Sequence, residues 1–302
     1  MGNVTVQARA QRLIYLGSQS FEGRLARAAK GIGMRISKRL ILHAATLLIC
    51  GLMISGQAFG QSERETRQMM ASANEHLAFM GENVRLAVVE YITAGENEGQ
   101  TVYFNDRAKQ MDTHWVPGDP RRGGFLDIAW LSDQVDGAAK GLSLAETQAA
   151  VGRALETWQE ARCSNIPLTQ LPDFGLDWGF VQWMAGMGGV EGWLADITQA
   201  GWLPGDFFEL TLGAGASGEV LGVTFTFGWI DEDGNFTDIN GDGKDDVAFR
   251  EIYYNNAFDW GIDSNYPIDV ETIVLHETGH GLSQGHFGKL SQTNRNGKFH
   301  FA

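Results

Sequence analysis

The sequence predicts an α+β fold, and three observations indicate this class. Short runs rich in β-branched and aromatic residues have the pattern of strands, at residues 83–92, 100–105, 125–131, 220–230 and 247–255. Residues 142–161 and 270–282 carry helix start signals followed by apolar positions at helical spacing. The sequence shows no internal repeat or low-complexity segment, so the strands and helices are expected to share a packed core.

The helix predicted at 142–161 has the clearest start. Ser143 and Glu146 have the spacing of a capping box, in which each side chain accepts a hydrogen bond from the other residue's backbone N–H. Val151, Leu155 and Trp158 then fall on one face of the helix. This stripe indicates packing on the core rather than a binding surface.

Three further segments divide the chain. Residues 61–80 are polar and compatible with a helix, and residues 193–218 are expected to contain a short strand followed by a long glycine-rich loop. The Pro/Gly-rich segment 116–124 predicts a boundary. It separates a small N-terminal region of residues 61–120, for which a propeptide role stays open, from a main domain of residues 121–302.

The N-terminal segment has the pattern of an export signal. Residues 34–60 combine a cationic start, an apolar run from Leu40 to Ile54 and an exit of small residues. The apolar run is about fifteen residues long, short of the roughly twenty that span a bilayer, which favours a cleaved signal over a membrane anchor. We therefore expect a secreted protein, extracellular or periplasmic, with residues 1–33 as an extension upstream of Met34.

The charge of the chain argues against nucleic-acid binding. The net charge is −14, although the first 60 residues carry eight Lys/Arg and one acidic residue. Residues 61–302 therefore hold 15 basic and 36 acidic residues. Nucleic-acid recognition needs a basic face, whereas an acidic surface suits a soluble protein that holds cations.

Residues 276–286, HETGHGLSQGH, contain a metal-binding pattern. His276 and His280 are one turn apart on the predicted last helix, which Asp269 can cap, so both imidazoles can reach one ion. Glu277 lies beside them and can polarise a metal-bound water. This spacing favours a catalytic zinc site over histidines that only face solvent or cap the helix.

The third histidine of the pattern needs a change of chain direction. A catalytic zinc takes three protein ligands and keeps one position open. His286 can reach the ion only if the helix ends after His280 and the chain turns back. Gly281 and Gly285 make such a turn feasible, because glycine adopts positive φ without steric cost.

The motif resembles HExxHxxGxxH, the zinc signature of the metzincin metallopeptidases, and is most similar to the matrixin branch, bacterial type. The resemblance covers roughly residues 125–290, although only the zinc motif is sharply specific. It implies a twisted mixed sheet packed on the capped helix and on an active-site helix. The segments LADIT, LGVTFTF and AFREIYYN resemble successive strands of that sheet, and residues 221–227 would be the edge strand that receives an extended peptide substrate.

The resemblance also implies residue roles. His276, His280 and His286 would be the zinc ligands, and Glu277 would be the general base. The expected function is that of a secreted zinc-dependent endopeptidase in which a metal-activated water hydrolyses peptide bonds. Two alternatives stay open: a catalytically inactive zinc- and calcium-binding relative, and a non-enzymatic secreted module stabilised by calcium.

The sequence departs from the family pattern in several places. Ser283 stands where the family turns with glycine, so either this serine or a neighbouring glycine must adopt positive φ. The last methionine is Met187, so the methionine turn is missing and the C-terminal subdomain is expected to be incomplete. No histidine lies between His114 and His276, so the family's second, structural zinc is expected to be absent.

The cysteines are few. Cys50 lies in the signal segment, which leaves Cys163 as the only thiol of the mature chain. A reactive thiol, an intermolecular bridge and a missing partner all stay open. Because Cys163 follows the capped helix, a structural cysteine is favoured over the inhibitory cysteine switch of matrixins.

A second cation site is predicted in residues 238–246. Oxygen side chains alternate around a glycine-enabled bend there, as in short loops that wrap calcium; they belong to Asp238, Asn240, Asp242, Asp245 and Asp246. The glutamate position of an EF-hand is Phe249, so no EF-hand is expected. The alternative is an ordinary polar turn, which the same residue types favour.

Overall fold

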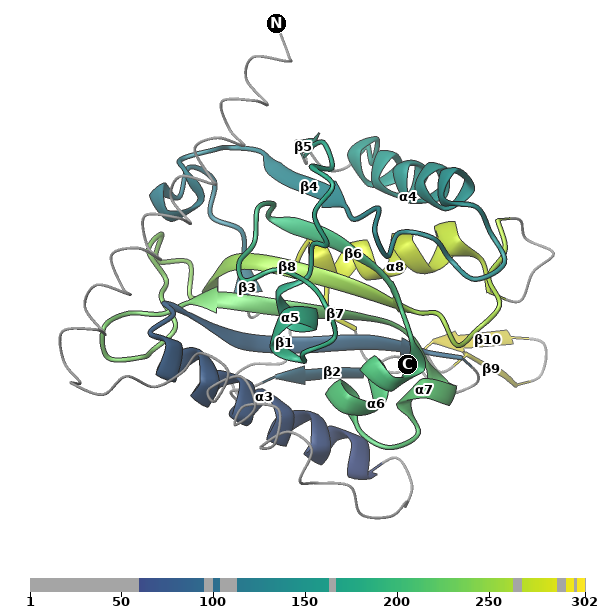
Figure 1. Cartoon of the computed structure of the whole chain (residues 1–302), viewed down its shortest axis with the longest axis horizontal. Coiled ribbons are helices and arrows are strands. Elements are labelled where there is room, and N and C mark those ends of the chain that lie inside the picture. The colour runs from purple at the N-terminus through teal and green to yellow at the C-terminus, as the bar shows by residue number, and fades with distance from the viewer. Residues whose placement is uncertain are drawn as a thin grey trace, which may run out of the picture.

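The computed structural model describes residues 60–94, 100–103, 113–162, 167–262, 268–286, 292–295 and 298–301. In these residues, eight strands form one mixed sheet in the order β2-β1-β7-β8-β6-β4-β5, with β3 beside β8 (Figure 1). The strands of this sheet are β1 (Val84–Thr93), β2 (Gln100–Tyr103), β3 (Thr113–His114), β4 (Ile128–Ser132), β5 (Leu168–Gln170), β6 (Ile197–Leu203), β7 (Val220–Trp229) and β8 (Asp245–Asn255). The predicted α+β class is confirmed.

Helices pack against the sheet, and most of them lie between two of its strands in the sequence. They are α3 (Gly60–Met80), α4 (Leu144–Gln159), α5 (Phe180–Met184), α6 (Gly205–Leu212), α7 (Ala216–Glu219) and α8 (Val270–Gly281), with a short 3-10 helix at Pro120–Arg122. A separate hairpin is formed by β9 (Gln292–Arg295) and β10 (Lys298–Phe301). Among the helices that the structure describes, none has the length and apolar character needed to cross a bilayer.

The predicted capping box of α4 is present. The Ser143 Oγ accepts from the Glu146 N–H at 3.3 Å, and the Glu146 carboxylate accepts from the Ser143 N–H at 2.9 Å. Val151 and Leu155 are buried, and the Trp158 Nε1–H donates to the Leu275 carbonyl of α8 at 2.8 Å. The predicted stripe therefore packs α4 against the helix that carries the histidine motif.

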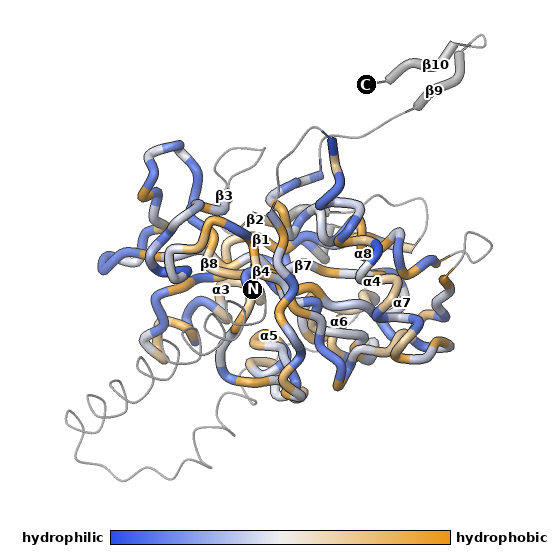
Figure 2. The backbone as a smooth tube through the Cα atoms, turned by 90° about the horizontal axis from the view of Figure 1, so that it is seen from above, coloured by the Kyte–Doolittle hydropathy of each residue, from blue (hydrophilic) through white to orange (hydrophobic). Residues whose placement is uncertain are grey.

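The sheet separates two apolar clusters. Along β8, Phe249 and Tyr253 belong to the cluster with α3, α5 and α6, whereas Ile252 and Tyr254 belong to the cluster with α4 and α8. Figure 2 shows hydrophobic positions concentrated along the central strands and hydrophilic positions in the surrounding loops. The alternation of these β8 side chains between the two clusters is the two-residue period of a strand that is buried on both faces.

The prediction of a long glycine-rich loop within residues 193–218 is wrong. Helices α6 and α7 occupy most of the segment after β6. Phe207, Phe208 and Leu212 are buried in the core, so apolar burial outweighs the local glycine content. Gly213, with φ 102°, then ends α6 in a conformation that favours glycine.

The expectation that residues 221–227 form an edge strand is also wrong. β7 is bonded to β8 on one side and to β1 on the other, both antiparallel, so neither of its edges is free along residues 222–228. The outermost strand on this side of the sheet is β2. The sequence could not reveal this pairing, because β1 precedes β7 by more than a hundred residues.

The N-terminal region is joined closely to the main domain. Its strand β1 pairs along β7, and Met70 and Leu77 of α3 lie in the same apolar cluster as Phe225 of β7. The Asn74 Oδ1 of α3 accepts a hydrogen bond from the Leu86 N–H at 2.7 Å, and the Asn74 Nδ2 donates to the Leu86 carbonyl at 3.0 Å. The Pro/Gly segment 116–124 therefore connects two parts of one sheet.

Two groups of expectations lie outside the described residues. The signal segment does so up to residue 59, and its last residue, Gly60, is the first residue of α3. Cys163 also lies outside the described residues, so its partner and its role stay predictions.

Candidate metal centre

Helix α8 positions the first two histidines. Asp269 caps its start, because the Asp269 carboxylate accepts from the Thr272 N–H at 2.8 Å. The helix packs against α4, β7 and β8, and it ends at Gly281. His276 and His280 therefore project from one face of a helix that is fixed on two sides.

The three predicted histidine ligands converge. The Nε2 atom of His276 lies 3.1 Å from the Nε2 of His280 and 3.1 Å from the Nε2 of His286. One ligand atom from each side chain lies within 4.8 Å of the other two. Within the described ranges, this is the one group of three or more His, Cys, Asp or Glu residues gathered closely enough to hold a metal ion.

Ser283 makes the turn that brings His286 back to the helix. It has φ 72° and is the one non-glycine residue in the left-handed region among those described. Of the alternatives left open by the sequence, the serine itself therefore adopts the positive φ. For a residue with a Cβ this conformation costs on the order of 1 kcal/mol, so neighbouring contacts must hold it.

The same turn orients His280. The Gln284 carbonyl lies 2.5 Å from the His280 Nδ1, and the Glu90 carboxylate lies 3.2 Å from the same nitrogen. Two acceptors at Nδ1 favour the tautomer that carries its proton there. The Nε2 lone pair of His280 is then directed at the other two histidines, as metal-bound histidines require.

Sequence reasoning missed Glu90, which lies on β1 and is 5% exposed. The signal that could have identified it is the one acidic residue of a mainly apolar strand, VRLAVVEYIT. A buried carboxylate needs a partner, and a histidine of a predicted metal site is a suitable one. The pairing still depends on β1 lying beside β7, which the sequence did not show.

Burial and neighbouring charge divide the histidines into two kinds. Burial, together with the charge of the neighbouring imidazoles, lowers the pKa of His276 and of His286 to about 4. Burial also acts to lower the pKa of His280, but the Glu90 carboxylate outweighs it and raises that pKa to about 9. Two ligands are thus neutral at pH 7, and the third must lose a proton before it can bind a metal.

Glu277 has one carboxylate oxygen held and one without a partner. It is fully buried, and its Oε2 accepts from the Thr224 Oγ1 of β7 at 2.6 Å. The Oε1 is buried and makes no hydrogen bond of ordinary geometry, although the Ile92 backbone N–H acts to lower the pKa of this carboxyl. Burial raises the pKa of Glu277 to about 7. A Cβ at Gly222 would lie 3.0 Å from this Oε1, so glycine there leaves room for the carboxylate.

The arrangement fits zinc. Zn–N bonds to histidine are about 2.0–2.1 Å long, so two nitrogens on one tetrahedral ion lie roughly 3.3 Å apart. The separations of 3.1 Å between the Nε2 atoms are close to that value. Three nitrogen donors from the chain leave the fourth position of a tetrahedral ion open, as in a catalytic rather than a structural zinc site.

The predicted calcium residues are differently arranged. Both oxygens of Asp238 accept backbone N–H groups, from Asp242 and Gly243. The Asp242 carboxylate accepts from the Lys244 N–H and contacts the His114 ring at 2.6 Å. Asp246 points elsewhere, since its Oδ2 accepts from Arg121, Thr237 and Ile239. The loop is closed by its own hydrogen bonds, and calcium stays a prediction.

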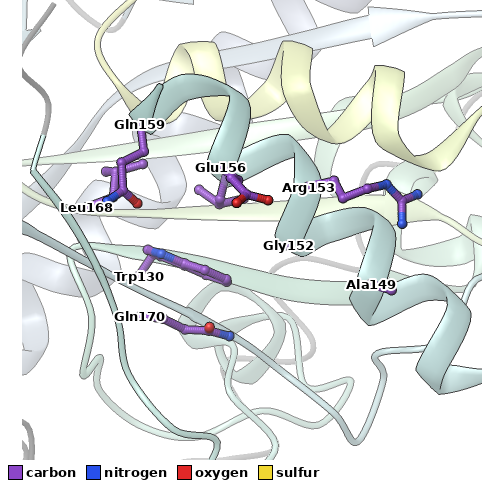
Figure 3. A pocket seen from close by; sticks show the side chains of 9 residues that line it. Trp130, Ala149, Gly152, Arg153, Glu156, Gln159, Leu168 and Gln170 are labelled. Atoms are coloured by element: carbon purple, nitrogen blue, oxygen red, sulfur yellow. The ribbon is translucent and has the colours of Figure 1, made fainter. Parts of the chain in front are cut away.

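A surface pocket lies away from these residues. It is lined by α4, β4 and β5, and none of the predicted site residues lines it (Figure 3). Its wall combines the Trp130 ring with the polar side chains of Glu156, Gln159 and Gln170. This pocket shows no grouping of side chains with catalytic character.

Comparison of the chain with protein-family models, with curated proteins and with solved structures finds no match.

Proposed function

We propose that this protein is a secreted zinc-dependent endopeptidase of the metzincin type, with His276, His280 and His286 as zinc ligands and Glu277 as the general base. The observation that carries the proposal is the convergence of three imidazole side chains, two of them on the helix that also carries the buried Glu277. The likeness of the motif and of the upstream segments to matrixins supports the same reading.

The reaction divides its tasks between the ion and the chain. When bound, zinc supplies Lewis-acid polarisation and lowers the pKa of water towards about 7. Glu277 takes the proton of the attacking water at Oε1 and passes it to the leaving amine. Thr224 holds the other oxygen, so the carboxylate keeps its orientation through both transfers.

The approach of a substrate differs from the one that the resemblance implies. A peptide cannot add to β7 as a new strand, because β1 already occupies that edge. His276 and His286 are partly exposed, whereas Glu277 and His280 are buried. An extended peptide would therefore reach the cluster from the side of His276 and His286, with β1 as part of the wall.

An inactive zinc-binding relative is the second candidate. The observation that favours it is the same occupied edge of β7, because strand addition is the physical reason why enzymes of this kind accept extended chains. Both candidates predict that zinc binds, and they differ only in turnover.

Cleavage of a casein or gelatin substrate by the full chain tests the proposal. We expect cleavage by the zinc-loaded protein, its loss in Glu277→Gln, and full zinc content in that variant. Glu271→Gln is the matched control, because Glu271 lies on the same helix and is ion-paired at the surface with Arg153. A zinc-loaded chain that cleaves neither substrate would assign the protein to the second candidate.

A further inference from the structure

Ser283 is held in its left-handed conformation by a buried arginine. The Arg250 Nη1 donates to the Ser283 Oγ at 3.0 Å and to the Gly281 carbonyl at 2.7 Å. One guanidinium nitrogen thus bonds to two residues of the turn that connects His280 with His286. A glycine at position 283 would relax the backbone, but it would offer no side chain to Arg250.

Arg250 is itself held on several sides. It lies on β8, is 1% exposed, and donates to the hydroxyls of Thr226 at 2.9 Å and Thr113 at 2.7 Å. Its guanidinium lies 5.1 Å from the centre of the Trp115 ring. The Trp115 Nε1–H donates to the Gly281 carbonyl at 2.9 Å. The group that holds the turn is therefore a fixed part of the core.

The turn between Gly281 and Gln284 carries two features of the metal centre. It directs His286 back to the helix, so that its Nε2 lies 3.1 Å from that of His276. It also presents the Gln284 carbonyl to the His280 Nδ1. A displacement of the turn would move one ligand and release the orientation of another. Contacts of this outer kind are commonly worth 10- to 100-fold in metal affinity.

We propose that Arg250 and Ser283 are positioning residues of the metal centre, and that their hydrogen bond, the Arg250–Ser283 clamp, fixes the turn that delivers His286. The inference rests on the proposed zinc site. The opposing interpretation is that Ser283 is a tolerated replacement for glycine. The two interpretations differ in sign for Ser283→Gly, since a tolerated serine would be improved by glycine and a clamped one would be weakened.

Zinc affinity of the full-length chain, measured by competition with a chromophoric chelator, decides between them. We expect Ser283→Ala and Ser283→Gly each to weaken zinc binding by about tenfold or more. Cobalt(II) loaded into the same variants should show a broadened and weaker visible absorption, because one imidazole is less well placed. Ser283→Gly keeps the backbone unstrained, so a loss of affinity in this variant cannot be attributed to misfolding at position 283.

Glu271→Gln is the control, because it changes a surface side chain of α8 that pairs with Arg153 and makes no contact with the turn among the hydrogen bonds that the structure describes. We expect its zinc affinity to stay within about threefold of the wild-type value. A Ser283→Gly variant that binds zinc as tightly as the wild type would overturn the clamp. A wild-type chain that binds no zinc would overturn the proposed function as well.

Discussion

Two segments of this protein have the spacing of a metal site, and the structure treats them differently. In residues 276–286, the Nε2 atoms of His280 and His286 each lie 3.1 Å from the Nε2 of His276, so donor nitrogens from a helix and a turn gather at one point. In residues 238–246, the carboxylates of Asp238 and Asp242 are turned onto backbone N–H groups of their own loop. Both segments contain suitable residue types, but only the first directs them at a common point.

The spacing of suitable residues in the sequence does not by itself decide whether they form a metal site. The histidines lie on elements that are fixed by other contacts: α8 against α4 and β7, and the turn against Arg250. In the acidic loop, residues 238–243 are exposed, and both oxygens of Asp238 make local hydrogen bonds of the kind found in ordinary turns. Asp242 and Asp246 have additional partners outside the loop, in His114 and Arg121. A set of metal ligands is preorganised where contacts with the surrounding core hold its side chains in place.

The largest expected effect is the loss of a histidine ligand. His276→Ala should weaken zinc binding by at least about a hundredfold, because two imidazoles cannot complete the three-ligand set of a catalytic site. Chelator competition measures the change. Asp242→Ala in the acidic loop is the matched control and should leave zinc affinity unaltered. Equal losses in the two variants would remove the distinction between the segments.

Zinc binding should also release a proton. At pH 8, His276 and His286, with pKa values of about 4, are neutral, whereas His280, with a pKa of about 9, still carries a proton that the metal displaces. Zinc affinity should therefore fall by at least about tenfold for each pH unit between 9 and 7. Calorimetry at pH 6, where a zinc-bound water with a pKa near 7 keeps its proton, should give about one proton released from His280 in buffers of different ionisation enthalpy. A value of zero would contradict the assigned state of His280.

Stability without metal should depend on pH through the same groups. The lowered pKa values of His276 and His286 favour the neutral form in the folded state, so their contribution is lost as pH falls from about 6.5 towards 4. The raised pKa of His280 acts in the opposite direction, and its contribution is lost as pH rises from 6.5 to about 9. Urea unfolding of the metal-free chain should show both losses, and His280→Gln should remove the alkaline one.

A smaller effect is expected at Thr224. Thr224→Val removes the hydroxyl that donates to Glu277, which favours the protonated carboxyl and raises its pKa further above 7. The acid limb of the pH–rate profile for kcat/KM should then move to higher pH, with zinc content unchanged. A fall in activity with no shift of the limb would show that Thr224 acts only by packing.

The smallest effect is expected in the acidic loop. The carboxylates of Asp238 and Asp242 already accept hydrogen bonds from backbone N–H groups of the loop. Millimolar calcium should therefore raise the Tm by no more than a few degrees. Asp238→Ala should cost about 1 kcal/mol or less, as is typical of exposed polar contacts. A large calcium-dependent rise in Tm that is lost in Asp238→Ala would instead show that residues 238–246 also form a metal site.

Local signals in the sequence predicted much of this molecule. The capping box of α4, the Asp269 cap of α8 and the strands β7 and β8 follow from short-range patterns, and so does the grouping of His276, His280 and His286. These features depend on residues that are neighbours in the chain, where propensity and spacing act directly.

Long-range pairing could not be predicted in the same way. The position of β1 beside β7 brings Glu90 to His280 and removes the expected edge strand, yet nothing in either segment specifies the other. The role of Arg250 is hidden for the same reason, because its partners lie on β3, β7 and the turn after α8. Contacts between distant segments decide how the site is supported and how a substrate can reach it.

Metal content is the most direct test of the zinc site. The full chain, purified without chelator and analysed by elemental mass spectrometry, should hold about one zinc, which is removed by a chelator and restored by added Zn²⁺. A folded chain that contains no zinc, and takes up none when zinc is supplied at pH 8, would contradict the assignment of His276, His280 and His286 as a metal centre.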